Sequence, residues 1–173
     1  MKELAHPRPR DAAAVDLPRA LQNALEVTAA TYRYVADVET EFAPGPPVVC
    51  FGSDLNQVFL NLIVNAAHAM EDKHDGRGRL GVRTWTEGDQ VVIAISDTGA
   101  GIAEANRERI FDAFFTTKEV GRGTGQGLAI SRSIVVDRHG GSLTFDSKLG
   151  VGTTFYVRIP IAGPRQHGRS AAA

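Results

Sequence analysis

A single cysteine, Cys50, occurs among the 173 residues, so the chain cannot form an internal disulfide. This scarcity fits a reducing compartment, and Cys50 stands in an apolar run, where we expect it to pack in a core. No apolar run approaches the roughly 20 residues that cross a bilayer, and the first residues lack the apolar core of a signal peptide. The net charge of −1 gives no basic footprint for nucleic acid. We therefore expect a soluble, cytoplasmic domain, and the sequence leaves a membrane-anchored parent protein open.

Both ends of the chain lack the hydrophobic patterning of its middle. Residues 1–15 contain Pro-Arg pairs followed by alanines and are predicted to be a linker or the end of an upstream element. Residues 162–173 show no core-forming pattern and are predicted to be a disordered C-terminal tail. Residues 16–161, in contrast, are long and apolar enough for one globular domain with a sizeable core.

Hydrophobic periodicity within residues 16–161 predicts a mixture of helices and strands. Asp16 is expected to cap the first helix, with Pro18 in its first turn, and Ser53 or Asp54 to cap the second. Helices are expected at 17–34, from 54 onward, at 103–111 and at 128–137, the last with Ile130, Ile134 and Val135 inward. Strands are expected at 38–42, 48–51, 79–86, 90–96, 143–146 and 153–159. Because strands and helices do not alternate regularly, the pattern favours a two-layer α/β sandwich over a doubly wound sheet.

Three polar residues follow one line along the second predicted helix, beside its apolar stripe. Asn61, Asn65 and His68 are spaced i, i+4 and i+7. Mg²⁺ takes few protein oxygens when a triphosphate supplies the negative charge, so an amide is a suitable ligand. We assign Asn65 to the metal, Asn61 to the phosphate side and to catalysis, and His68 to a phosphate. The alternatives are two surface asparagines and an ordinary exposed histidine.

A tight turn follows the apolar strand that ends at Asp97. A carboxylate at this position can accept a hydrogen bond from the 6-amino group of adenine. Gly99 and Gly101 would let the backbone pass close to the ring, where a Cβ would collide. By itself, the same segment is also compatible with an ordinary turn between strand and helix.

A glycine-rich segment next to three phenylalanines resembles a mobile lid over phosphates. Phe111, Phe114 and Phe115 are expected to anchor it against the core. Hydroxyls, cations and backbone N–H groups suit a triphosphate, and a helix that starts near residue 126 adds its positive end. The predicted phosphate contacts are Thr116, Thr117, Lys118, Arg122, Gly123, Thr124, Gly125 and Gly127, and Lys118 is also assigned to catalysis beside Asn61. Neither a P-loop motif nor a dinucleotide-binding fingerprint is present in the chain.

The order of these segments resembles the N, G1, F and G2 boxes of the ATP-binding catalytic domain of sensor histidine kinases, in the Bergerat-fold superfamily. The matching segments are Asn61–Ala66, Asp97–Ile102, Phe111–Lys118 and Gly123–Leu128, followed by His139–Gly141 and Gly150–Phe155. The resemblance covers residues 16–160, with Gln126 as one departure. It implies a mixed sheet of about five strands covered on one face by about three helices, with a mobile ATP lid. It also implies nucleotide contacts from Leu128 and Thr154, with ATP and Mg²⁺ as cofactors.

The resemblance also implies a function for the chain: transfer of the ATP γ-phosphate to a histidine on a separate dimerisation hairpin. His6 lacks the surroundings of such a phosphoacceptor, so residues 1–15 are expected to be the exit from that hairpin. The implied partners are the hairpin and a response regulator or receiver domain, with this fragment monomeric. Hydrolytic relatives carry a glutamate at the position of Asn61, and an amide cannot take a proton, which favours transfer to a protein. An anti-sigma-type serine kinase and a non-catalytic nucleotide-binding module are the alternatives.

Overall fold

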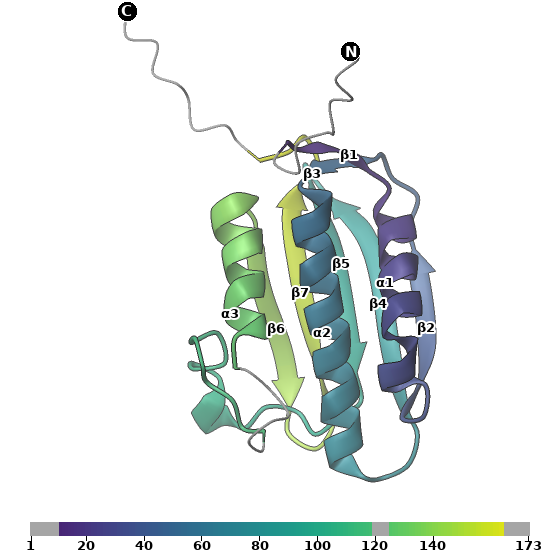
Figure 1. The fold of residues 1–173 in the computed structure, drawn as a ribbon, viewed down its shortest axis with the longest axis vertical. Helices are drawn as coiled ribbons and strands as arrows, with labels where there is room; N and C mark the ends of the chain where they lie inside the picture. Colours follow the sequence, from purple (N-terminus) through teal and green to yellow (C-terminus); the bar gives the residue numbers. More distant parts are fainter. Residues whose placement is uncertain (1–10, 119–124, 165–173) are drawn as a thin grey trace, which may run out of the picture.

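The computed structural model describes residues 11–118 and 125–164. Five strands form one sheet, in the order β2 (Ala36–Phe42), β4 (Gly78–Glu87), β5 (Gln90–Asp97), β7 (Gly152–Pro160) and β6 (Ser142–Lys148). The β2–β4 pair is parallel and the other neighbours are antiparallel. In the described part of the chain, one face of the sheet is covered by three helices: α1 (Leu17–Tyr32), α2 (Gly52–Lys73) and α3 (Gly127–Arg132) (Figure 1). The predicted two-layer α/β sandwich is confirmed.

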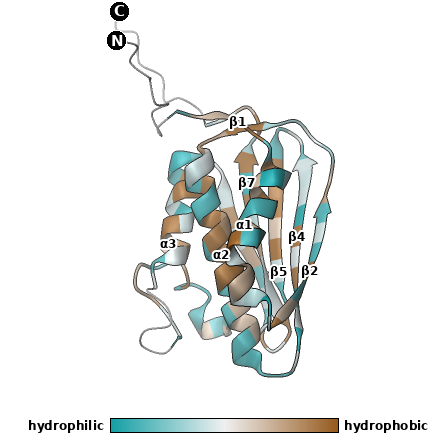
Figure 2. Ribbon diagram, turned by 45° about the vertical axis from the view of Figure 1, so that its right-hand side comes forward, coloured by the Kyte–Doolittle hydropathy of each residue, from teal (hydrophilic) through white to brown (hydrophobic). Residues whose placement is uncertain are grey.

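The core lies between the helices and the sheet, with α2 in the middle (Figure 1). Apolar residues on α2 recur at helical spacing, and Val58, Phe59, Leu62 and Ile63 have no exposed surface. Brown segments on α2 and on the central strands behind it mark apolar residues on both layers (Figure 2). Burial on this scale stabilises the domain mainly through the hydrophobic effect. Within residues 11–118 and 125–164, no helix has the length and apolar character needed to span a bilayer.

The two helix starts differ from each other. Asp16 caps α1 as predicted, because its carboxylate accepts a hydrogen bond from Arg19 N at 3.1 Å. The prediction of Ser53 or Asp54 as the cap of α2 is wrong: α2 begins at Gly52, and no side chain caps it. A distant side chain pairs with the backbone at this helix end instead, because the Phe51 N–H donates a hydrogen bond to His139 Nε2 at 3.0 Å. Sequence spacing could not reveal this tertiary cap.

The folded unit extends beyond the predicted boundaries at both ends. Residues of the expected linker form β1 (Ala13–Val15), which pairs antiparallel with β3 (Val48–Cys50). Near the C-terminus, Val49 N donates to Ile161 O at 3.0 Å, and Gly163 packs against Val49. These three short segments are ordered by their contacts with one another. Local hydrophobic patterning in the sequence therefore does not mark β1 or the residues near Gly163 as part of the fold. Residues 1–10 and 165–173 lie outside the described residues.

The helix predicted at 103–111 is wrong. Only a 3₁₀ turn, η1 (Glu104–Asn106), forms there, and the following backbone continues with i→i+3 hydrogen bonds. Arg107 donates to the Ser147 carbonyl of β6, while Ile110 is buried. These two contacts hold the segment against the sheet in a tighter winding than an α-helix allows.

The last predicted helix forms but faces the core differently. It consists of α3 and a π-helical continuation, η2 (Ser133–Arg138). Ile134 and Val135 are buried as predicted, whereas Ile130 is 37% exposed and Ser131 is fully buried. Ser131 shares the inward face with Ile134 and Val135 at spacings of three and four residues, which leaves Ile130 outside it.

Candidate functional site

A cavity of about 400 Å³ lies between α2 and the segments that follow β5 and precede α3. This volume is in the range of small-ligand sites. Ten of the predicted site residues line it: Asn61, Asn65, His68, Gly101, Thr116, Thr117, Lys118, Gly125, Gly127 and Leu128. The four predicted segments, which lie between residues 61 and 128 of the sequence, thus supply one cavity. Gly123 and Thr124, with the neighbouring Arg122, lie outside the described residues.

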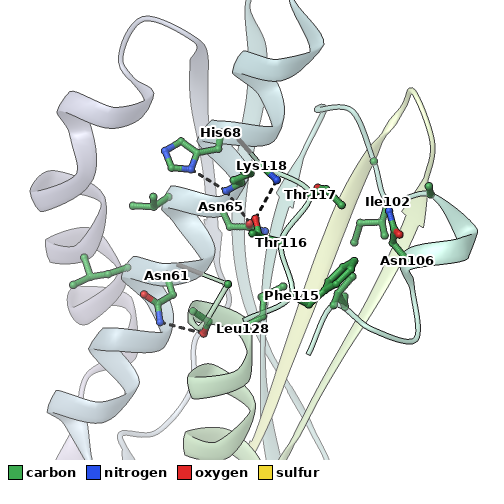
Figure 3. Close-up of a pocket in the computed structure, with 17 residues that line it drawn as sticks. Asn61, Asn65, His68, Ile102, Asn106, Phe115, Thr116, Thr117, Lys118 and Leu128 are labelled. Carbon is green, nitrogen blue, oxygen red and sulfur yellow. Dashed lines mark hydrogen bonds between the residues drawn. The ribbon is translucent and has the colours of Figure 1, made fainter. Parts of the chain in front are cut away.

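Lys118 meets two polar side chains of α2. Its Nζ lies 2.9 Å from His68 Nδ1 and 3.5 Å from Asn65 Oδ1 (Figure 3). An ammonium can only donate, so His68 Nδ1 accepts and the ring proton is on Nε2. Asn65 Oδ1 likewise directs its lone pair at a cation. The Lys118 ammonium therefore occupies the position beside Asn65 Oδ1 where a metal cation would bind.

The donor set around Asn65 fits a metal that is held mostly by a nucleotide. Among the side chains that the structure describes, no cluster of three or more His, Cys, Asp or Glu could hold a metal ion. A hard cation with few protein ligands keeps waters and phosphate oxygens in its shell. The site therefore fits Mg²⁺ accompanied by a polyphosphate.

Asn61 links α2 to the start of α3. Its Nδ2 donates to Gly127 O at 3.3 Å (Figure 3). The same nitrogen also donates to Ser131 Oγ at 3.4 Å. A backbone carbonyl can only accept, so the nitrogen of the amide must face α3. Asn61 therefore offers its oxygen, and not its amino group, to anything bound beside it.

Asp97 is buried at the end of β5 and does not line the cavity. Its carboxylate accepts a hydrogen bond from Gly99 N at 2.8 Å. Burial raises the pKa of Asp97 to about 6, against the lowering effect of the Gly99 and Thr153 backbone N–H groups. A buried carboxylate whose lone pairs are not all used can still accept from a ligand amino group. The role of Asp97 toward adenine stays a prediction.

The glycines of this turn pack closely against other elements of the fold. A Cβ on Gly99 would lie 2.5 Å from the Ala69 carbonyl carbon of α2. A Cβ on Gly101 would lie 2.4 Å from Lys148 O, and the φ of Gly101 is +74°. The close neighbours are thus α2 and the β6–β7 turn, and the approach to an adenine ring stays a prediction. Gly101 still lines the cavity, whereas Gly99 does not.

Gly99→Ala is expected to destabilise the domain by about 2–3 kcal/mol, because backbone atoms of α2 cannot move aside cheaply. Urea unfolding of the nucleotide-free domain measures this effect. Gly127→Ala is the matched control for stability, since its Cβ would meet nothing closer than Asn61 Cγ at 3.7 Å. Equal stabilities of the two variants would contradict the close packing between the Asp97 turn and α2.

The base of the predicted lid is held by the backbone. Phe114 N donates to Gly125 O at 2.8 Å, and Lys118 N donates to Thr116 Oγ1 at 3.0 Å. Phe111 and Phe115 pack against the core as predicted, but the prediction for Phe114 is wrong. Phe114 is 72% exposed, and its backbone φ is +66°. The hydrogen bond to Gly125 fixes this backbone, so its ring cannot turn inward with its neighbours.

Thr154 does not contribute to the cavity. It lies on the face of the sheet that carries no helices, because side chains alternate along β7 and Thr153 and Phe155 are buried on the other face. Thr153 is the residue that pairs with Asp97 in the β5–β7 ladder, and its Oγ1 lies 2.9 Å from Ser147 Oγ. Thr153 does not line the cavity either, so the nucleotide contact expected of this strand stays a prediction.

Several lining residues were not predicted as site residues. They are Leu60, Val64, Ile102, Ala103, Asn106, Ile110 and Phe115. Leu60 and Val64 each precede an asparagine of α2 by one position, so helical spacing would have placed them beside the site. Ile102, Asn106 and Phe115 lie across the cavity from α2 (Figure 3). Asn106 lies in the segment 103–111, which forms a 3₁₀ turn and not the predicted helix, and Ile102 and Phe115 flank that segment, so no helical spacing indicated the three residues.

Comparison with known proteins gives a consistent result. The sequence model of the family described as "Histidine kinase-, DNA gyrase B-, and HSP90-like ATPase" matches residues 52–163. Sporulation kinase E of Bacillus subtilis is 36% identical over 116 residues, which are 67% of this chain and 15% of that protein. Sensor kinase CckA of Brucella abortus is 38% identical over 138 residues, 72% of this chain and 14% of that protein. The chain thus spans about a seventh of the length of these curated relatives.

Solved structures show the same fold. The catalytic domain of histidine kinase ThkA aligns with a TM-score of 0.76 at 27% identity, covering 88% of this chain and 97% of that one. Full-length ShkA in complex with AMPPNP aligns with a TM-score of 0.76 at 28% identity, covering 92% of this chain and 33% of that one. This chain therefore aligns with nearly all of the ThkA catalytic domain and with one third of the longer ShkA protein.

Proposed function

Because the chain belongs to the family of histidine kinase-, DNA gyrase B- and HSP90-like ATPases, we propose that it binds Mg·ATP and transfers the γ-phosphate to a histidine on another domain. The resemblance to sensor histidine kinases is confirmed by this membership and by the relatives. The proposed acceptor lies on a dimerisation hairpin, and the proposed downstream partner is a response regulator or receiver domain. We place the domain in the cytoplasm, with its parent kinase free or membrane-anchored.

The observation that carries this proposal is the composition of the cavity wall. In the part of the chain that the structure describes, the wall contains amides, hydroxyls, Lys118 and His68 but no aspartate or glutamate. Hydrolysis needs a base for water, whereas an imidazole acceptor is itself the nucleophile. Positioning and charge neutralisation are then sufficient. His68 Nδ1 already accepts a hydrogen bond from Lys118, so the wall favours transfer over hydrolysis.

We assign each part of the nucleotide to its own residues. Asp97 accepts from the adenine amino group. Thr116, Thr117 and Lys118 neutralise and orient the phosphates, assisted by the backbone of Gly125 and Gly127 at the start of α3. Asn65 holds the metal, which supplies charge neutralisation on the phosphates when bound. Asn61 keeps the glycine segment close to α2 through Gly127 O, so that the phosphate-facing backbone stays in place.

Asn65→Ala is expected to weaken Mg·ATP binding by about tenfold or more and to abolish most of the Mg²⁺ dependence. Calorimetric titration with ATP and ADP, with and without Mg²⁺, measures both. Asn56→Ala, on the same helix and outside the cavity, is the matched control and should bind as the wild type does. Binding that does not depend on Mg²⁺ in the wild type would contradict the assignment of Asn65.

The chemistry of the product separates transfer from its alternatives. Incubation with Mg·ATP and a purified histidine-bearing hairpin should give an acid-labile phosphoprotein, as expected for phosphohistidine. An acid-stable phosphate on a protein substrate would favour a serine kinase. Rapid, steady ATP hydrolysis by the isolated chain would contradict transfer, and the absence of any nucleotide binding would favour a non-catalytic module.

A further inference from the structure

Two lone pairs of different chemistry converge on one point of the cavity. Lys118 Nζ lies within hydrogen-bonding reach of an imidazole nitrogen, His68 Nδ1, and of an amide oxygen, Asn65 Oδ1. A cation, the Lys118 ammonium, thus already stands between them. The arrangement marks a position where positive charge is stabilised by one nitrogen and one oxygen ligand.

Both ligands come from the same rigid element. Asn65 and His68 are three residues apart on α2, so their side chains project from one face and one above the other. The tautomer of His68 also suits a metal, because the lone pair on Nδ1 points at the ammonium and the ring proton is on Nε2. A helix holds such a pair more firmly than a loop does.

We propose that His68 Nδ1 is a second protein ligand of the nucleotide-bound divalent cation, together with Asn65 Oδ1. This inference rests on the proposed binding of metal and ATP. When the metal complex enters, Lys118 leaves this position for the phosphates, because an ammonium and a divalent cation repel each other at such short range.

A nitrogen ligand changes which metal the site prefers. Oxygen ligands suit Mg²⁺, whereas imidazole suits later first-row metals, whose affinities rise from Mn²⁺ through Co²⁺ to Ni²⁺. The site is therefore expected to favour Mn²⁺ or Co²⁺ over Mg²⁺ more strongly than an all-oxygen site would. His68 is thereby a residue that determines metal specificity.

The test is electron spin-echo envelope modulation of the domain loaded with Mn²⁺ and a non-hydrolysable ATP analogue. Imidazole bound to Mn²⁺ should give a directly coordinated ¹⁴N modulation that disappears in His68→Gln. His74→Asn is the matched control, because His74 ends the same helix in a left-handed conformation that asparagine tolerates. Its modulation should match that of the wild type.

The same samples give the metal preference. The ratio of nucleotide affinity with Co²⁺ to that with Mg²⁺ should fall by about tenfold in His68→Gln and stay unchanged in His74→Asn. Bound nucleotide without ¹⁴N modulation and with an unchanged ratio would overturn the metal role and leave His68 as a phosphate donor. If no nucleotide binds with any metal, the proposed function fails and the inference fails with it.

Discussion

Asp97→Asn is expected to weaken adenine-nucleotide binding by about 10- to 100-fold and, at the same time, to stabilise the nucleotide-free domain. The loss of affinity follows from replacing a charged acceptor, whose hydrogen bonds are the stronger kind. The gain in stability follows from burial, which raises the pKa of Asp97 from 3.8 to about 6. This shift means that folding destabilises the ionised carboxylate by about 3 kcal/mol relative to the protonated one. An asparagine amino group cannot accept the Thr153 N–H, so the net gain should be smaller, about 1 kcal/mol. The melting temperature should then rise by about 2–4 °C.

The pH dependence of stability gives this prediction a definite sign. Between pH 3.8 and about 6, the folded state holds a proton on Asp97 that the unfolded state has released. The contribution of Asp97 to the free energy of unfolding therefore falls as the pH rises through that window, and it is lowest above the window. The wild type should show this contribution and Asp97→Asn should lack it. Nucleotide affinity of the wild type should move the opposite way and fall below about pH 6, where the acceptor becomes protonated.

Calorimetric titration and thermal unfolding between pH 4 and 8 measure the two effects. Asp146→Asn is the control, because it makes the same chemical change at an exposed position on β6. A variant that loses affinity and stability together would indicate a structural role for Asp97. A variant that keeps its affinity would remove Asp97 from adenine recognition.

The sequence predicted the cavity better than it predicted the segments between its parts. Asn61, Asn65 and His68 follow from helical spacing alone, because a helix fixes which side chains share a face. Lys118 follows from its neighbourhood of hydroxyls and glycines, which suits phosphate. These predictions needed only local geometry, and the structure brings the four residues together.

Predictions failed where a distant partner decides the conformation. Phe51 precedes the first residue of α2, and His139 accepts its N–H, while β1 exists only because β3 pairs with it. Arg107 reaches the Ser147 carbonyl, which favours the 3₁₀ winding over the predicted helix. Such contacts join residues tens of positions apart, so no periodic pattern within either segment records them. Thr154 shows a related limit, since successive residues of a strand face opposite sides of the sheet and the motif alone does not tell which side carries the helices.

His139 is expected to be the polar side chain on which stability depends most. Its Nε2 accepts from Phe51 N at 3.0 Å, and its Nδ1 donates to Ile134 O at 2.8 Å. The ring is fully buried and lies edge-on to the Phe51 ring at 5.3 Å. His139→Ala leaves a cavity and two orphaned backbone groups, and should cost about 3 kcal/mol, or about 6–12 °C in melting temperature.

Two variants separate the hydrogen bonds of His139. His139→Gln can place an oxygen near the Nε2 position, which keeps the acceptor for Phe51 N–H. His139→Asn can place an amino group near the Nδ1 position, which keeps the donor to Ile134 O. If the tertiary cap of α2 is the larger contribution, His139→Gln should be the more stable of the two in urea unfolding. Equal stability of His139→Ala and the wild type would exclude the cap altogether.

Acid should destabilise the wild type through the same residue. Burial lowers the pKa of His139 below its ordinary 6.5, and the donor to Ile134 O only partly offsets this. Below about pH 6.5 the unfolded state takes up a proton that the folded state refuses, so stability falls as pH falls. Asp97 contributes with the opposite sign below about pH 6, so the measurement belongs in the Asp97→Asn background. There, unfolding free energy should decrease from pH 7 to pH 5 with His139 present and change less with His139→Gln. A decrease of the same size in both proteins would show that another group causes the loss, since only His139 differs between them.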